Sequence, residues 1–119
     1  MKRDMHLIRE IALIIEDDCS QILQTPEIHV AGFTEVQIAY HVRIMVDAGL
    51  VDAIDANSMD GECWLINGLT WKGHEFLDNA RDKSRFDNVL KKVGQVSFSV
   101  LTEALKQAAM GMLFGGDQS

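Results

Sequence analysis

Apolar residues recur at helical spacing in five stretches of the chain. Residues 4–17 carry apolar side chains at Leu7, Ile8, Ile11 and Ile15, which lie three or four apart and so share one helix face. Asp4 is the expected N-cap of this helix. The same spacing predicts helices over 34–48, 71–82 and 84–93, and a last helix that begins after a cap at Ser97 or Ser99.

Polar signals set the expected ends of these helices. Thr34 and Gln37 form the Thr-x-x-Gln pattern of a capping box, and Gly49 is a C-terminal stop. Thr70 and Ser84 are the expected caps of the third and fourth helices, and Gly94 ends the fourth. Trp71 is expected to pack in the core with the third helix.

Alternating or β-rich stretches predict three strands. Residues 27–31 alternate in polarity after the single proline, Pro26. Residues 50–56 and 62–66 are separated by a loop that contains the turn pair Asp60-Gly61, which predicts a hairpin.

The element order is helix, strand, helix, hairpin and further helices, which is the order of a winged-helix domain. The expected fold class is therefore α+β: a winged-helix-like domain over 1–82, with the hairpin as the wing. A C-terminal helical extension over 83–114 is expected to pack on it as one structural domain, and 115–119 is expected to be a flexible tail.

Composition narrows the class of protein. The chain has 119 residues, of which 47% are hydrophobic and 24% charged, enough for one packed core and unlike a disordered, collagen-like or disulfide-rich chain. The apolar runs are too short for a membrane span, so no membrane association is expected. Arg9 and Glu10 interrupt the only candidate signal segment, and a cytoplasmic location is expected.

Three segments resemble a known family. They are MKRDMHLIREI at the start, EVQIAYHVRIMVDAGLV at 35–51, and GLTWKGHEFLDNARD at 68–82. The chain resembles the domain-of-unknown-function 2513 family of small bacterial and phage proteins from Met1 to about Leu105. The resemblance implies a winged-helix-like fold and a prophage or mobile-element setting, with no activity, ligand or catalytic residue.

DNA binding is the first functional hypothesis, since the helix before a wing reads the major groove. The candidate residues on this helix are Gln37, Tyr40, His41 and Arg43. His41 also fits a core or interface position. Residues 10–70 contain eleven acidic residues and one basic residue, Arg43, which argues against phosphate contacts by this part of the chain.

A basic cluster near the fourth helix is the better candidate for phosphate contacts. It consists of Arg81, Lys83, Arg85, Lys91 and Lys92. Residues 71–119 have a net charge of +1, whereas residues 1–70 have a net charge of −8. This asymmetry would steer a nucleic acid or an acidic protein to one end of the molecule. The cluster also fits a solvated helix face, or a complement to the acidic half of a neighbouring subunit.

The last helix is the candidate dimer interface, since it is apolar around more than one face. The residues proposed for this interface are Leu105, Ala109, Met112, Leu113 and Phe114. The alternative is that this helix packs on its own core.

Metal and catalytic sites have little support. His6 with Glu10 and His74 with Asp78 offer two ligands each, too few for a metal site. No GxSxG, phosphate-loop or GxGxxG pattern is present. We therefore expect a protein that is not an enzyme and has no metal or cofactor.

Two functions follow from the sequence. The first is a small winged-helix regulator linked to double-stranded DNA. The second is an acidic protein-interaction or dimerisation module that binds a basic protein and not DNA. The similarity of the element order to a winged helix favours the first function. The excess of acidic residues favours the second.

Overall fold

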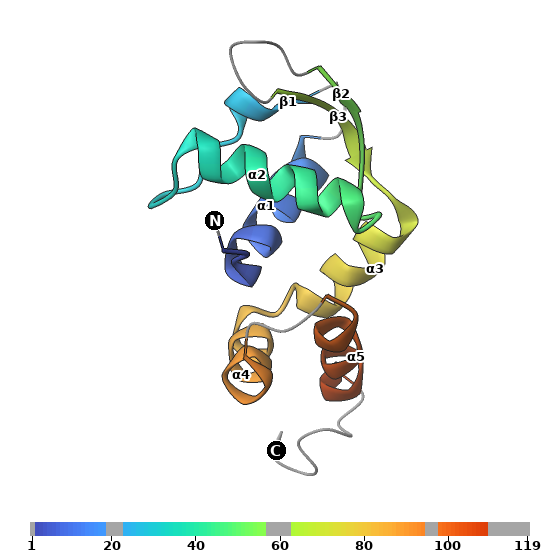
Figure 1. The fold of residues 1–119 in the computed structure, drawn as a ribbon. Helices are drawn as coiled ribbons and strands as arrows, with labels where there is room; N and C mark the ends of the chain where they lie inside the picture. The colour runs from blue at the N-terminus through green and yellow to red at the C-terminus, as the bar shows by residue number, and fades with distance from the viewer. Residues whose placement is uncertain (1, 19–22, 57–62, 95–97, 110–119) are drawn as a thin grey trace. The chain divides into compact units, whose positions relative to one another are not determined.

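The structure, a computed structural model, describes residues 2–18, 23–56, 63–94 and 98–109. The chain divides into two compact units, Met1–His74 and Glu75–Ser119. The described residues combine five α-helices with a three-stranded sheet (Figure 1). The predicted α+β class is confirmed. The predicted arrangement of 1–82 and 83–114 as one structural domain stays a prediction.

Two capped helices form the centre of the first unit. Helix α1 spans Met5–Asp17, and the Asp4 carboxylate accepts hydrogen bonds from the backbone N–H groups of His6 and Leu7. Helix α2 spans Glu35–Asp47 and begins with the full Thr34–Gln37 capping box. Both predicted caps are confirmed, because each depends only on residues within one turn of the helix. The two helices pack on each other, and each buries apolar residues, such as Ile11 on α1 and Val42 on α2.

The sheet packs beside these helices. Strands β2 (Val51–Asp55) and β3 (Trp64–Leu69) form the predicted antiparallel hairpin, and β1 (Leu23–Gln24) pairs with the other edge of β3. The order in the sheet is β1-β3-β2. The ladder is irregular at Asn67: Ala53 lies opposite Ile66, whereas Asp52 lies opposite Gly68. This bulge lets β3 continue through Asn67-Gly68, where the hairpin was expected to end.

The predicted strand over 27–31 is wrong. Residues Thr25–Glu27 form a 3₁₀ turn, η1, and the Ile28 N–H donates to the Thr25 carbonyl instead of to a strand. The Phe33 N–H likewise donates to the Val30 carbonyl in a turn. Pro26 has no N–H to add to a ladder and favours a turn, so the strand ends before it. The Thr25 hydroxyl instead accepts a hydrogen bond from the Trp64 N–H at 3.0 Å.

A close backbone contact joins the end of α2 to the next helix. Helix α3 spans Trp71–Ala80, and a Cβ on Gly73 would clash with the Leu50 carbonyl oxygen. Gly49 has a φ of +80°, the left-handed conformation expected at a helix stop. The Thr70 hydroxyl donates to the Gly49 carbonyl and accepts from the Gly73 N–H, so Thr70 caps α3 as predicted.

Trp71 is 82% exposed, so the expectation that it packs in the core is wrong. The buried stripe of α3 is Gly73, Phe76, Leu77 and Ala80. Trp71 lies two residues before this stripe begins, and two residues turn a helix by about 200°. Its side chain therefore lies on the opposite face of α3, with the exposed residues Glu75 and Asp78.

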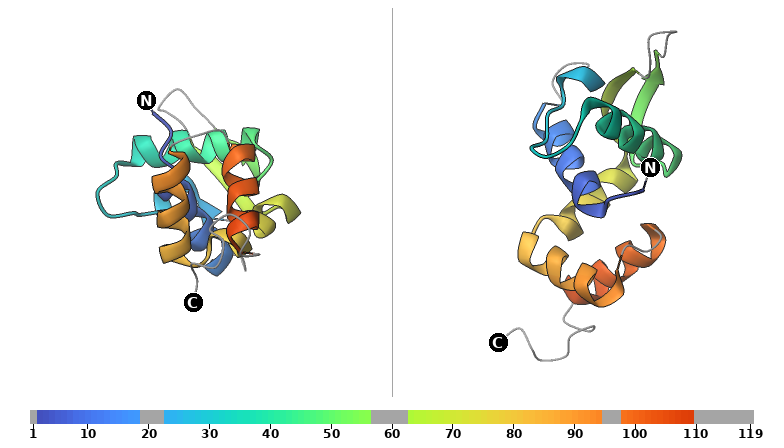
Figure 2. Two further views of the ribbon diagram at one scale, coloured as in Figure 1. Left: turned by 90° about the horizontal axis from the view of Figure 1, so that it is seen from below. Right: turned by 60° about the vertical axis from the view of Figure 1, so that its left-hand side comes forward.

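The second unit contains a helix pair. Helices α4 (Lys83–Val93) and α5 (Phe98–Ala109) pack side by side (Figure 2) through apolar residues that include Phe86, Leu90 and Leu101. Gly94 ends α4, as predicted.

The predicted caps of the second unit need correction. Asp82 and not Ser84 caps α4, since the Asp82 carboxylate accepts from the Arg85 N–H at 3.1 Å. Ser84 lies inside the first turn of α4, and Ser99 lies inside α5. The other predicted cap of α5, Ser97, lies outside the described residues. Among the helices that the structure describes, none has the length and apolar character to cross a membrane.

Candidate partner-binding surface

The exposed side of α2 carries a mixture of apolar, aromatic and charged side chains. Val36 is 67% exposed, Tyr40 is half-buried, and Arg43 is exposed. These residues lie four and three apart and therefore form one stripe along the helix. The Arg43 guanidinium carbon lies 5.3 Å from the centre of the Tyr40 ring, a cation–π distance.

Two of the four α2 residues proposed for DNA contact hold structural positions within the first unit. The Gln37 side-chain oxygen accepts from the Thr34 N–H at 2.8 Å, which closes the capping box. His41 is 2% exposed, so it occupies the core position that was the alternative for it. Tyr40 packs against the His41 ring edge-on, with the ring centres 5.4 Å apart.

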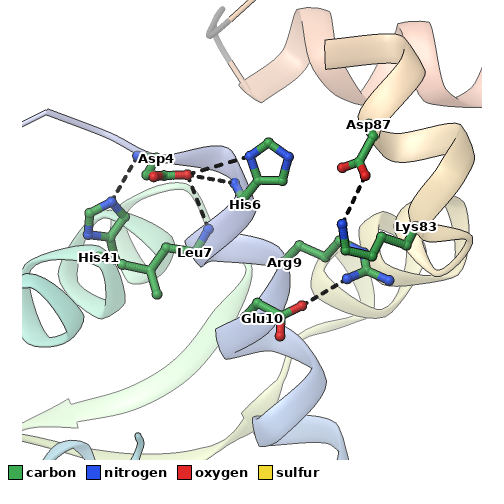
Figure 3. A network of polar contacts seen from close by, with 8 residues as sticks. All are labelled: Asp4, His6, Leu7, Arg9, Glu10, His41, Lys83 and Asp87. Carbon is green, nitrogen blue, oxygen red and sulfur yellow. Dashed lines mark hydrogen bonds and ion pairs between the residues drawn. The ribbon is translucent and has the colours of Figure 1, made fainter. Parts of the chain in front are cut away.

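The His41 ring connects the start of α1 to α2. Its Nε2 lies 2.9 Å from the Asp4 backbone nitrogen (Figure 3). Its Nδ1 lies 2.7 Å from the Gln37 carbonyl oxygen. A backbone N–H can only donate, so Nε2 accepts and the proton is on Nδ1, which donates to Gln37. Both ring nitrogens are thereby used inside the first unit, which makes His41 a positioning residue for α2.

Exposed carboxylates lie at both ends of α2 and on the neighbouring strand β2. Glu35 begins α2, Asp47 ends it, and Asp52 and Asp55 lie on β2, which packs against α2. We call these four residues and the stripe Val36–Tyr40–Arg43 the acidic α2–β2 surface. The further acidic residues expected on the wing, Asp60 and Glu62, lie outside the described residues.

Asp47 lies where a carboxylate costs stability. The C-terminal end of a helix has a partial negative charge, which repels an acidic side chain by about 0.3–1 kcal/mol. Asp17, at the end of α1, is placed in the same way. Asp47 also adds to the negative potential that this surface offers to a cationic partner.

The five basic residues proposed for phosphate contacts all lie in the second unit. Arg81 pairs with Asp78 at 3.0 Å and Lys83 with Asp87 at 2.9 Å, so two of the cations are used in local ion pairs. Arg85, Lys91 and Lys92 lie on α4, the last two in its final turn. Arg43 lies in the first unit, where the structure brings it together with Tyr40 on α2. Within the second unit, α4 carries Lys83, Arg85, Lys91 and Lys92.

The proposed dimer interface is only partly described. Leu105 is fully buried within the single chain, so it is not on the surface. Ala109 is the last residue of α5, and Met112, Leu113 and Phe114 lie outside the described residues. The exposed side of α5 is instead marked by Val100, which is 49% exposed. A shallow hollow of about 370 Å³ lies beside Val100, Ala104 and Gln107.

The histidine pairs considered as metal ligands have other neighbours. His6 Nδ1 lies 3.8 Å from an Asp4 carboxylate oxygen, and His74 Nδ1 lies 4.0 Å from a Glu16 carboxylate oxygen. The Glu10 carboxylate pairs with the buried Arg9 at 2.9 Å. Within the described ranges, no group of three or more His, Cys, Asp or Glu side chains could hold a metal ion.

The exposure of the apolar residues Val36, Ile54 and Trp71 was not predicted from the sequence. The signal for Val36 was present: it falls outside the stripe Ile38, Val42, Met45 that faces the core. Ile54 pairs with Leu65 across the sheet, on the face opposite Ile66. Its exposure follows from the alternation of β2, since Ile54 lies three residues after the buried Val51 and therefore on the other face of the strand.

Comparison with known proteins gives a family but no activity. The family described as "Hypothetical protein (DUF2513)" matches residues 2–99. A protein of Haemophilus influenzae (strain ATCC 51907 / DSM 11121 / KW20 / Rd), named "Uncharacterized protein", is 30% identical over 113 residues, which cover 95% of this chain and 96% of the relative. No solved structure matches. Because the family match covers most of the chain, this protein belongs to the domain-of-unknown-function 2513 family.

Proposed function

We propose that the first unit is a winged-helix module that binds a basic protein partner through the acidic α2–β2 surface, and that the protein acts by binding and not by catalysis. The element order supports the fold proposal. A helix, a short strand, a second helix and a hairpin follow one another, and the sheet order β1-β3-β2 joins the short strand to the hairpin. In a winged helix, α2 and the β2–β3 hairpin are the elements that face a partner.

The charge of these two elements is the observation that carries the proposal. Among their described residues, the exposed carboxylates are those of Glu35, Asp47, Asp52 and Asp55, and the exposed basic side chain is that of Arg43. DNA affinity depends on Lys and Arg side chains that neutralise phosphates. Carboxylates at those places repel DNA and attract cationic protein segments.

The apolar part of the surface supports a protein as the partner. Val36 exposes most of its apolar side chain, and Tyr40 and Arg43 are of two residue types enriched where protein interfaces are energetically strongest. An apolar and aromatic centre with charged residues around it is the usual anatomy of such interfaces. Arg43 stacked on Tyr40 loses little side-chain freedom on binding, which lowers the entropic cost of association.

Site-specific photo-crosslinking tests this proposal. A benzophenone amino acid at position 36 is expected to capture a protein in cells that express the full chain, whereas the same group at Asp17 is not. The double variant Asp47→Lys/Asp52→Lys should abolish the product, since it reverses two of the four carboxylates. A product that persists in this variant, or no product at position 36, would overturn the proposal.

DNA-linked regulation in a prophage setting is the second candidate function. Its support is the element order together with the side chains of Arg85 and Lys91, for which the described residues offer no ion-pair partner. In this candidate α4 supplies phosphate contacts, and Arg43 with Tyr40 supplies base contacts. A mixed-sequence duplex that binds the protein with a steep dependence on salt would favour it over the first candidate.

A further inference from the structure

We infer that the basic partner of the acidic α2–β2 surface is helix α4 of a second copy of this chain. This inference rests on the proposed function and names the partner for the same surface. The partner must present a rigid basic face, and the chain itself contains one.

The exposed face of α4 is strongly basic. Phe86, Val89 and Leu90 are buried on one side of this helix. The exposed residues on the other side are Lys83, Ser84, Asn88, Lys91 and Lys92. The segment 81–92 has a net charge of +3, in a protein whose net charge is −7. This cationic face is preformed, because the Asp82 cap and the Gly94 stop fix both ends of the helix.

Some of the charges that would meet take part in no ion pair with the described residues. No ion pair in the described part of the chain involves Glu35, Asp47 or Asp52 on one surface, or Arg85 or Lys91 on the other. Lys83 does pair with Asp87, but this pair is exposed, and such pairs contribute little stability. Exchange of Asp87 for a carboxylate of a second copy would therefore cost little.

Symmetry provides the contact area that one helix lacks. Helix α4 has 11 residues and is about 16 Å long. One such helix covers less than the roughly 800 Å² per partner that stable interfaces bury. Each copy carries both surfaces, so a two-fold pair makes the α4 contact twice and doubles the buried area.

Sedimentation equilibrium of the full chain tests the inference. We expect a dimer at about 50 mM salt and a monomer at about 500 mM salt, since salt screens exposed charge pairs. The variants Lys91→Glu/Lys92→Glu and Asp47→Lys/Asp52→Lys should each raise the dissociation constant at least about tenfold. The controls Asp17→Lys and Lys106→Glu change the charge of exposed residues elsewhere and should leave it unchanged.

Mixing the two charge-reversed double variants gives the decisive result. Each one alone has two surfaces of the same sign, but the mixture again offers opposite charges in both contacts. We expect a mixed dimer to form in the mixture. If the mixture stayed monomeric and the dimer formed only when all four substitutions were in one chain, α4 would act within its own chain. This result would overturn the inference. A wild-type chain that stays monomeric at low salt would also overturn it.

The crosslinking experiment separates failure of this inference from failure of the proposed function. A product at position 36 with the mass of two copies supports both. A product with a different protein keeps the proposed function and refutes the self-association. No product refutes both.

Discussion

Helices α2 and α4 have similar construction and opposite charge. Each begins with a polar N-cap, buries one apolar stripe and exposes the rest. Around α2 the exposed charges are mainly carboxylates, whereas on α4 they are mainly Lys side chains. The buried sides of the two helices are therefore both apolar, whereas their exposed sides differ in the sign of their charge. Fold stability does not require either sign of charge, and the proposed binding function depends on these exposed charges.

The two units that contain these helices also differ in how they are held together. In the first unit, hydrogen bonds connect residues far apart in sequence, as from Asp4 to His41 and from Trp64 to Thr25. In the second unit, hydrogen bonds connect residues within one helical turn, as from Lys83 to Asp87 and from the Arg85 N–H to Asp82. We therefore expect single substitutions to destabilise the first unit more than the second.

The substitution Gly73→Ala should have the largest effect. Its Cβ would clash with the Leu50 carbonyl, and backbone at a strand–helix junction has little room to move. We expect a loss of about 3 kcal/mol in the free energy of unfolding, measured by urea denaturation. Glu75→Ala, on the exposed face of the same helix, is the control and should change stability by less than about 0.5 kcal/mol. Equal effects of the two would refute the close contact.

His41→Ala should come next. It removes the acceptor for the Asp4 N–H and a buried ring, for an expected loss of about 2 kcal/mol. Arg43→Ala, two residues away and exposed, should change stability by less than about 0.5 kcal/mol. If Arg43→Ala proved the more destabilising, the assignment of His41 to the core and of Arg43 to the surface would be wrong.

Asp82→Ala should have an intermediate effect in the second unit. Loss of the cap on α4 is expected to cost about 1 kcal/mol. Ser84→Ala should be nearly neutral, because Ser84 lies inside the helix. Hydrogen exchange of the first-turn amides of α4 measures this directly, with faster exchange expected only in Asp82→Ala. Faster exchange in Ser84→Ala alone would restore Ser84 as the cap.

Asp47→Asn should have the smallest effect and the opposite sign. Removal of a negative charge from the C-terminal end of α2 is expected to stabilise the protein by about 0.5 kcal/mol. The same change should weaken capture of a partner by the crosslinker at position 36. Circular dichroism on heating gives the first result and crosslinking yield the second. If Asp47→Asn lowered the stability and left the crosslinking yield unchanged, Asp47 would not belong to the proposed binding surface.

Local signals made much of the fold predictable. The caps at Asp4, Thr34 and Thr70 depend on residues within one turn, so their side chains reveal the helix starts. Strand β1 was not predictable in this way. It has two residues, and its existence depends on backbone pairing with Leu65 and Ile66, about 40 residues later. The burial of Trp71 was predicted wrongly because the prediction relied on its large apolar side chain. Its position on the helix, opposite the buried stripe, makes it exposed.

The candidate surface was predictable in charge but not in detail. The acidic excess over residues 10–70 is visible in the sequence and survives as exposed carboxylates on α2 and β2. His41 was a candidate for DNA contact, although it lies three residues after Ile38 and four before Met45 and so on the buried stripe. The ion pairs depend on the three-dimensional positions of the charged side chains, and sequence spacing alone does not give these positions.

Fluorescence anisotropy with a labelled mixed-sequence duplex tests the central claim that the acidic α2–β2 surface does not bind DNA. The titration uses the wild-type chain and Arg43→Ala at low and at moderate salt. We predict no saturable binding by either protein at either salt concentration. Binding by the wild type that weakens steeply with salt, and that is lost in Arg43→Ala, would contradict the account and return α2 to the role of a DNA-reading helix.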